Sequence, residues 1–483
     1  MFQECVQKRL KQIDDRISIF ERVPNPKLKT GLEKPKKIPK IISSLKEDRQ
    51  AFGAMIGKNK PPEELLAYPL TSVPLALASP DGDLRQGSKA AFRNHLIEDA
   101  DALTTQPATG AFWIVDGMAV VRSILCKETW GEYVTAFFSF CTPGRDSFPL
   151  RLGIVFDCYK ESNIKQLTQL RRGMPGRRAF ITNPQQSMPK QNEWSSFLHN
   201  PENKTELIHF LVSFLKENKS RLVKVPTIIT ENEKSWLLTP TKITELEDCN
   251  HYEADTRLIY VATQVDMPVI IRATDTDVFI LMVHIYSWRN IDRPWQMKID
   301  HESFVNISAI CDHIGAEACN ILPAFHSITG CDTTSFPFRA GKVVPWKKLM
   351  KIRSYDLLST FGSSVPSDDG LLAAKEFFQK IMYHGEKGER YIETRVRMYK
   401  KQKVKSSEGI IPDENSALQH LKRSWLQCYI WCRCTEKQID FPAIDETFGW
   451  RQNDGFIQPL WYSCSQFPPD LSDASEEAEV NGK

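Results

Sequence analysis

Short apolar runs in this chain end repeatedly at acidic residues. Three such runs, Phe112–Val115, Leu150–Phe156 and Met267–Ala273, have the length and composition of buried strands. Helical stretches lie between them, and strands that alternate with helices predict an α/β fold with a mostly parallel central sheet flanked by helices. In such sheets ligands bind beyond the carboxyl ends of the strands. We therefore expect the acids that follow these strands to meet at one edge of the sheet.

The same patterns divide the 483 residues into four parts. Residues 1–105 form a peripheral N-terminal region, and residues 106–350 form the α/β domain. Residues 351–468 form a helical C-terminal region rich in aromatic and basic residues, and residues 469–483 form an acidic tail with a disordered composition. The α/β domain is thus expected to carry helical extensions at both ends.

The composition narrows the class of protein. A hydrophobic content of 41% and a charged content of 25% are typical of globular chains. Apolar runs stay shorter than the roughly 18 residues of a membrane span, and the N-terminus does not resemble a signal peptide. The scattered cysteines favour reduced thiols, so we expect an intracellular protein of the nucleus or cytoplasm without a membrane partner. Zinc on Cys428, Cys432 and Cys434 is the less favoured alternative.

Seven carboxylates are the candidate catalytic residues and metal ligands. Singly, each could be a turn or helix-capping acid. Asp275 and Asp277 make the strongest case, because two adjacent carboxylates between buried apolar runs repel each other unless a cation compensates them. Carboxylate oxygens suit Mg²⁺ or Mn²⁺, and two such ions can hold the attacking and leaving oxygens of a phosphodiester. The set is Asp116, Asp157, Glu253, Asp255, Asp275, Asp277 and Asp332.

Basic residues beside these acids predict a polyanionic partner, DNA or RNA. A basic segment follows Asp157, and part of it has helical spacing on one face. A solvated helix face is the alternative explanation. The candidate nucleic-acid-binding residues are Lys160, Lys165, Arg171, Arg172, Arg177, Arg178, Arg339 and Lys342.

The ordered acids resemble the flap endonuclease-like branch of the PIN-like 5′ nuclease superfamily. The similarity covers about residues 111–350 and rests on Asp116, on Ile154-Val-Phe-Asp157 followed by basic residues, on Glu253-Ala-Asp255, on Asp275-Thr-Asp277 and on Gly330-Cys-Asp332. The resemblance implies a PIN-like nuclease domain and two ions. One ion would bind Asp116, Asp157, Glu253 and Asp255, and the second would bind Asp275, Asp277 and Asp332, with some ligands shared.

The chain also resembles expanded, mobile-element-associated sets of animal proteins. The shared motifs are His-x-Glu-Ala-Asp-Thr-Arg, Asp-Thr-Asp-Val and Thr-Gly-Cys-Asp-Thr-Thr. This second resemblance implies no activity by itself.

Two features depart from the nuclease pattern. About 110 residues precede Asp116, whereas the family places its first acid near the N-terminus. The segment Phe336–Lys342 stands where flap endonucleases have a Gly-x-Gly hairpin, so we expect single-strand binding rather than flap specificity.

Three functions remain open from the sequence. The first is a Mg²⁺- or Mn²⁺-dependent nuclease, that is, a hydrolase acting on phosphodiester bonds. The second is a non-catalytic nucleic-acid-binding or assembly protein on a nuclease-like scaffold. The third is another Asp-x-Asp enzyme, such as a primase-type or sugar-transferring enzyme, which leaves Asp116, Asp157 and Asp332 unexplained.

Overall fold

The computed structural model describes residues 61–142, 149–159, 177–300, 302–401, 407–453 and 456–469. The chain divides into two compact units, each made of segments that are distant in the sequence. The α/β unit consists of Ser88–His326 and Cys428–Ala443. The helical unit consists of Met1–Gly87, Ser327–Gln427 and Ile444–Lys483.

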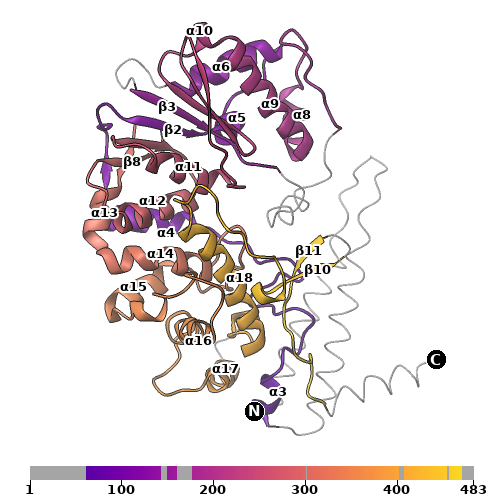
Figure 1. Cartoon of the computed structure of the whole chain (residues 1–483). Helices are drawn as coiled ribbons and strands as arrows, with labels where there is room; N and C mark the ends of the chain where they lie inside the picture. The colour runs from indigo at the N-terminus through magenta and orange to yellow at the C-terminus, as the bar shows by residue number, and fades with distance from the viewer. Residues whose placement is uncertain are drawn as a thin grey trace, which may run out of the picture. The chain divides into compact units, whose positions relative to one another are not determined.

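The α/β unit is built on a nine-stranded sheet with the order β1-β9-β8-β7-β2-β3-β4-β5-β6 (Figure 1). The five central strands, β8, β7, β2, β3 and β4, are parallel, and the strands on both sides of them are antiparallel. The strands are β1 (Leu103–Thr104), β2 (Phe112–Asp116), β3 (Arg151–Val155), β4 (Thr227–Glu231), β5 (Lys234–Leu238), β6 (Ile243–Leu246), β7 (Val269–Arg272), β8 (Trp295–Lys298) and β9 (Phe304–Asn306).

Helices cover both faces of this sheet. Trp113 and Val115 belong to one buried core together with residues of α5, α6, α8 and α9. Their neighbour Ile114 points to the opposite face, since alternate residues of a strand share a face, and α11 packs against β2 and β3. The helices are α4 (Ala90–Asp99), α5 (Gly117–Ser123), α6 (Trp130–Cys141), α8 (Gln191–His199), α9 (Pro201–Glu217), α10 (Lys219–Leu222), α11 (Ala254–Thr263), α12 (Thr276–Trp288), α13 (Ile307–Ile314) and α14 (Ala316–Ile328).

Local sequence signals explain where several of these helices begin. Thr129 and Glu132 form a capping box at the start of α6. Asn200 caps α9, and Pro201 occupies its first position, where the missing N–H costs nothing. Asp116 and Asp275 cap α5 and α12 with their side chains. The acids that follow β2 and β7 therefore also start the next helix.

The helical unit contains helices and one small hairpin. Strands β10 and β11 pair antiparallel. Buried tryptophans, among them Trp346 and Trp425, form part of its core. Its elements are α3 (Pro62–Leu66), α15 (Val343–Ile352), η2 (Tyr355–Leu357), α16 (Asp368–Phe377), η3 (Phe378–Met382), α17 (Tyr391–Lys400), η4 (Ser407–Gly409), most of α18 (Glu414–Cys432), η5 (Glu446–Phe448), β10 (Trp450–Asn453) and β11 (Phe456–Pro459).

The α/β class with helices flanking a largely parallel sheet, predicted from the sequence, is confirmed. The antiparallel hairpin β5–β6 was not predicted, because its residues Lys234–Leu246 mix polar and apolar side chains. The unit bounds also differ from the expected domains. Helix α4 was assigned to the peripheral N-terminal region, yet it packs against α12 in the α/β unit.

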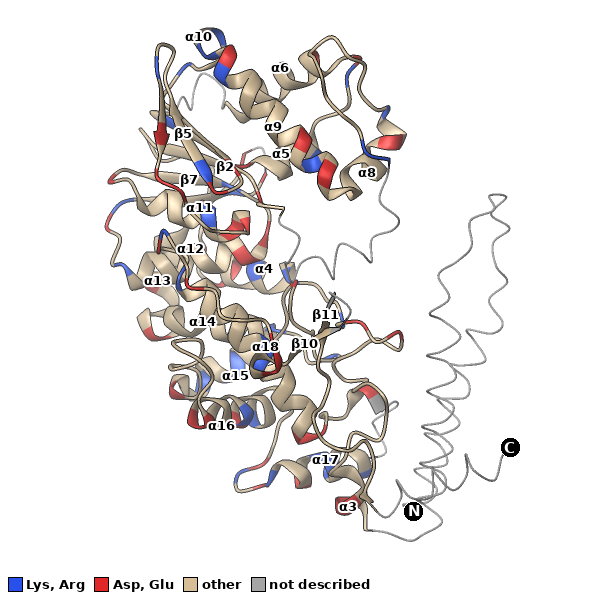
Figure 2. Cartoon of the chain, turned by 45° about the vertical axis from the view of Figure 1, so that its right-hand side comes forward, with Lys and Arg blue, Asp and Glu red and all other residues tan. Residues whose placement is uncertain are grey.

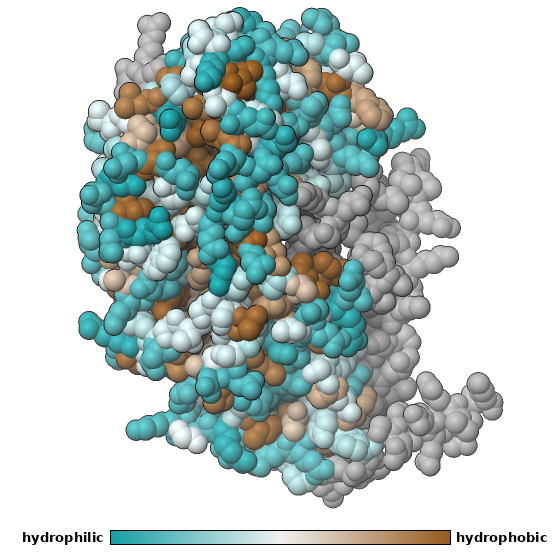
Figure 3. Space-filling model, in the orientation of Figure 1, coloured by the Kyte–Doolittle hydropathy of each residue, from teal (hydrophilic) through white to brown (hydrophobic). Residues whose placement is uncertain are grey.

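The surface view in Figure 3 shows hydrophobic residues interspersed with hydrophilic ones on the face drawn. Within the described ranges, no helix has both the length and the apolar character needed to cross a bilayer.

Candidate metal centre

Two predicted acids follow neighbouring parallel strands. Asp116 ends β2 and lies opposite Val155 of β3, and Asp157 follows two residues later. Asp116 Oδ1 accepts hydrogen bonds from the backbone N–H groups of Met118 (2.8 Å) and Ala119 (3.0 Å). Burial, followed by the nearby charge of Asp157, raises the pKa of Asp116 to about 6. The two carboxylates thus interact across the carboxyl edge of the sheet.

Helix α11 connects this pair to a third element. Oδ1 of Asp157 accepts a hydrogen bond of 2.8 Å from the backbone N–H of Ala254, the first residue of α11. Asp157, rather than the N-cap residue Glu253, therefore caps this helix with its side chain. The next residue, Asp255, is buried. The first turn of α11 brings Glu253 and Asp255 to the edge at which β2 and β3 end.

The third group of acids follows β7, the other neighbour of β2. Asp275 is the N-cap of α12, and its Oδ1 accepts a hydrogen bond of 2.9 Å from the backbone N–H of Asp277. Asp277 is only 4% exposed. One carboxylate oxygen from each of Asp255, Asp275 and Asp277 lies within 4.8 Å of the other two. This acidic triad could hold a metal ion, because carboxylate oxygens at this spacing match the donors of hard divalent cations.

Two cationic side chains, Lys89 just before α4 and Arg93 within it, reach the same loop. Nζ of Lys89 lies 3.0 Å from Oδ1 of Asp275 and 3.0 Å from Oδ2 of Asp277. One turn later, Arg93 donates a hydrogen bond of 2.6 Å to the carbonyl oxygen of Thr274. In Figure 2 acidic residues gather in red between the labels of α11 and α4. Sequence reasoning missed Lys89 and Arg93, because they lie in the segment treated as peripheral.

A buried histidine holds the other oxygen of Asp277. Nε2 of His326 lies 2.8 Å from Oδ1 of Asp277, and the His326 side chain is fully buried. The rings of Phe92 and Trp431 pack against the imidazole. Carboxylates that bind metals are commonly hydrogen-bonded by residues behind them, which fix the orientation of the ligand. No spacing rule pointed to His326, since it comes from α14, far from Asp277 in the sequence.

The structure brings six of the seven predicted acids to one edge of the sheet in the α/β unit. Asp116 interacts with Asp157, and Asp157 caps α11, which begins beside Glu253. Asp255 of α11 belongs to the triad with Asp275 and Asp277. Asp332 differs, because it belongs to the helical unit. There it lies two residues after Gly330 in a half-buried turn. A shared ion between Asp332 and the pair of α12 remains an expectation from the resemblance.

Other residues of the motif around Glu253 have structural partners. His251 is buried, and its Nε2 lies 2.6 Å from the carbonyl oxygen of Glu436. Burial lowers the pKa of His251 to about 4, which keeps the ring neutral near pH 7. Arg257 is fully buried and donates to the backbone of the β4–β5 turn, for example to the carbonyl oxygen of Lys234 at 2.8 Å. The motif thus contains two acids of the candidate site, Glu253 and Asp255, and two residues that stabilise the fold, His251 and Arg257.

Four of the eight predicted nucleic-acid-binding residues lie in the part of the chain that the structure describes. Arg178 is exposed and pairs with Glu202 at 3.1 Å, and its neighbour Arg177 is exposed as well. Arg339 is exposed, but Lys342 is buried and donates to Oγ1 of Thr329 at 2.7 Å. Lys342 thus does not present its charge at the surface, in contrast to the expectation. Lys160, Lys165, Arg171 and Arg172 lie outside the described residues.

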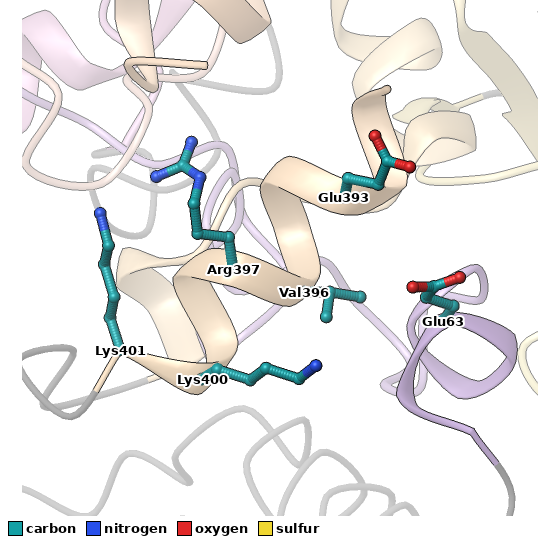
Figure 4. A pocket seen from close by; sticks show the side chains of 6 residues that line it. All are labelled: Glu63, Glu393, Val396, Arg397, Lys400 and Lys401. Atoms are coloured by element: carbon teal, nitrogen blue, oxygen red, sulfur yellow. The ribbon is translucent and has the colours of Figure 1, made fainter. Parts of the chain in front are cut away.

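The helical unit contains a separate pocket of about 390 Å³ between α3 and α17 (Figure 4). Arg397 on its wall is paired with Glu389 at 2.7 Å. The positive charge of Arg397 is therefore already compensated by Glu389. Its lining residues are Glu63, Glu393, Val396, Arg397, Lys400 and Lys401.

The cysteine alternative has a weaker geometry than the acidic triad. Sγ of Cys428 and Sγ of Cys432 lie 3.8 Å apart on α18, and Cys434 is buried. Among the described residues, the triad of Asp255, Asp275 and Asp277 is the group of His, Cys, Asp or Glu side chains with metal-binding spacing. The thiols do not belong to it.

Comparisons with protein-family models, with curated proteins and with solved structures found no significant match to this chain.

Proposed function

We propose that the α/β unit is a divalent-metal-dependent nuclease that hydrolyses phosphodiester bonds in DNA or RNA. The observation that supports this best is the meeting of the acidic triad with Asp116, Asp157 and Glu253 at the carboxyl edge of a parallel sheet. Ligand sites of open α/β sheets lie at this edge. An acid-lined edge without a phosphate-binding glycine loop fits metal-assisted hydrolysis better than nucleotide binding.

The residues divide into three roles in this proposal. Asp255, Asp275 and Asp277 would hold Mg²⁺ or Mn²⁺, and Asp116, Asp157 and Glu253 are candidates for a second ion. A bound divalent ion supplies a hydroxide at neutral pH and stabilises the charge on the leaving oxygen. His326 fixes the orientation of Asp277. Arg177 and Arg178 are exposed cations suited to phosphate contacts, because guanidinium groups pair with phosphate oxygens through two N–H groups.

The second candidate is a non-catalytic nucleic-acid-binding or assembly protein on a nuclease-like scaffold. The ion pairs of Lys89 with Asp275 and Asp277 favour it, because an internal ammonium reduces the need of these acids for a metal. The two candidates differ in whether metal binding leads to cleavage.

A cleavage assay with the full chain tests the proposal. Labelled 5′ flap, single-stranded and duplex substrates would be incubated with Mn²⁺ or Mg²⁺. Asp275→Asn, which keeps the helix-capping oxygen but loses the charge, should abolish cleavage. Glu245→Gln provides a matched control, because Glu245 is an exposed acid of β6 that pairs with Lys234.

A thermal melt with the same proteins separates the candidates. Metal that binds only the folded state raises the melting temperature by mass action. A Mn²⁺-dependent shift that is lost in Asp275→Asn, without cleavage of any substrate, would support the non-catalytic candidate. The absence of both cleavage and an Asp275-dependent shift would contradict a metal-dependent nuclease activity of the native chain.

A further inference from the structure

Lys89 occupies the position at which a cation would bridge two members of the acidic triad. Its Nζ lies 3.0 Å from one oxygen of Asp275 and 3.0 Å from one oxygen of Asp277. The Lys89 side chain is 15% exposed, so this ammonium is largely shielded from water. Lys89 is the residue immediately before α4. The site therefore has a covalently tethered cation of its own.

We propose that Lys89 is an internal competitor of the divalent cation, so that metal binding at the triad requires the ammonium to leave the carboxylates. This inference rests on the metal site of the proposed function and adds a regulatory element to it. Lys89 would hold the metal-free site in a stable, neutralised state and would set the metal concentration at which the site fills.

Distances make joint occupancy unfavourable. Mg²⁺ binds carboxylate oxygens at about 2.0–2.1 Å with strict octahedral geometry. An ammonium 3.0 Å from an oxygen of Asp275 and 3.0 Å from an oxygen of Asp277 would lie close to an ion held by the same two carboxylates, and two positive charges repel strongly in a poorly hydrated site. One oxygen of Asp275 also accepts the backbone N–H of Asp277, and one oxygen of Asp277 is bonded to His326. These bonds limit how far the carboxylates can turn to serve both cations.

The side chain of Lys89 can leave while its helix stays in place. Arg93 donates to the Thr274 carbonyl oxygen at 2.6 Å, and the ring of Phe92 packs against that of Phe325 at 5.1 Å. These contacts hold α4 against the loop after β7. The four-carbon stem of lysine is flexible, so rotation about its side-chain bonds is enough to remove the ammonium. The exchange of cations therefore needs no change of the fold.

A titration of the full chain with Mn²⁺ alone tests the inference without nucleic acid. Lys89→Met keeps the length and apolar stem of the side chain and removes the competing charge. We expect it to bind Mn²⁺ more tightly by about tenfold or more, because the lost cation contacts two carboxylates of the triad directly. The melting temperature of the metal-free protein should fall, and added Mn²⁺ should restore it. Lys89→Gln serves as a second variant if Lys89→Met does not fold.

Two matched variants separate competition from general charge effects. Arg93→Met removes a cation of the same helix whose bond is to a backbone carbonyl, and Lys234→Met removes an exposed cation of β5. Competition predicts clearly smaller gains in affinity for both than for Lys89→Met. Equal gains for Arg93→Met and Lys89→Met would overturn the inference. Unchanged or weaker Mn²⁺ binding by Lys89→Met would overturn it too, while leaving the proposed metal site intact.

The proposed function fails in a different way. If neither the wild-type chain nor Lys89→Met shows Mn²⁺ binding that depends on Asp277, the metal site itself is wrong. If only Lys89→Met binds Mn²⁺ measurably, and Asp277→Asn in that background abolishes the binding, the competition is supported.

Discussion

Nε2 of His326 lies 2.8 Å from Oδ1 of Asp277, and both side chains are buried. A buried carboxylate is costly unless hydrogen bonds or charges compensate it. Lys89 contacts the other oxygen of Asp277. Asp277 is thus held from two sides, by α14 and by the residue before α4, and its orientation at the triad is fixed by the fold.

Replacement of His326 should therefore affect both stability and metal binding. We expect His326→Ala to lower the free energy of unfolding by about 2–3 kcal/mol, because it leaves a buried acceptor without this donor. The affinity for Mn²⁺ should fall by about 10- to 100-fold, as for other residues that orient metal ligands. Urea unfolding and calorimetric titration measure the two effects. His326→Gln, which keeps a donor, should restore part of the affinity; equal loss in both variants would point to a packing role only.

The pKa of Asp116 gives a pH-dependent prediction. A folded-state pKa of about 6 lies above the usual value for aspartate, so the folded protein binds this proton more tightly than the unfolded chain does. The ionised group is therefore a cost that is absent below about pH 4 and complete above about pH 6. Asp116→Asn removes this cost and can still cap α5.

Without metal, Asp116→Asn should stabilise the protein at pH 7.5 by roughly 1–2 kcal/mol, less than the full linkage value because Asp116 is partly exposed. At pH 4 the variant and the wild type should be equally stable. Denaturant unfolding at the two pH values, with metal removed by a chelator, provides the measurement. A stabilisation that is the same at both pH values would show that the ionisation of Asp116, penalised first by burial and then by Asp157, is not its source.

The sequence predicted the elements that carry a strong local signal. The runs before Asp116, Asp157 and Asp275 are buried strands, and α12 spans the predicted Thr276–Trp288. These segments are mostly apolar, which leaves few alternative structures. The sequence also predicted that the acids lie at the carboxyl edge of the sheet, because a parallel topology places the ends of β2, β3 and β7 together.

Long-range partners could not be predicted in this way. Lys89 reaches Asp277 from the start of α4, and His326 reaches it from α14. Neither sequence segment carries a pattern that sets it apart from an ordinary helix. A contact between distant segments depends on packing, which hydropathy patterns do not encode. Lys342 was expected at the surface but is buried for a related reason: its ammonium group donates to Thr329 and lies over the ring of Phe336 inside the helical unit.

Arg257 should prove structural although it lies in the same motif as Glu253 and Asp255. It donates to the backbone carbonyl oxygens of Asn232, Glu233 and Lys234 and to Oγ of Ser235. Arg257→Met should lower the free energy of unfolding by about 3–4 kcal/mol, because the hydrogen bonds of a fully buried, charged donor to the β4–β5 turn are lost. Arg257→Lys should recover little of it, since an ammonium cannot reproduce the planar fork. Chemical denaturation tests both; a Lys variant as stable as wild type would contradict this role.

The segment after Asp332 predicts that cleavage, if present, has no preference for duplex flaps. A helix-hairpin-helix grips phosphates through free backbone N–H groups of a glycine-rich turn. Here the N–H of Phe336 is bonded to the carbonyl oxygen of Arg85 (2.8 Å), and the N–H of Phe338 to that of Ala76 (2.9 Å). The ring of Phe336 is buried against Gly330, where an added Cβ would lie 2.6 Å from the ring. These donors are therefore used within the helical unit and cannot bind a phosphate.

Arg339 is the exposed cation of this segment, and its guanidinium lies over the ring of Phe338 at 5.0 Å. Such a charge can contact a flexible single strand without a preformed hairpin. We expect a 5′ flap and a plain single strand of the same sequence to be cleaved at similar rates, and Arg339→Ala to weaken binding of both. Side-by-side cleavage time courses decide the matter. A much faster reaction on the flap, lost in Arg339→Ala, would mean that this turn rearranges into a duplex clamp when the substrate binds.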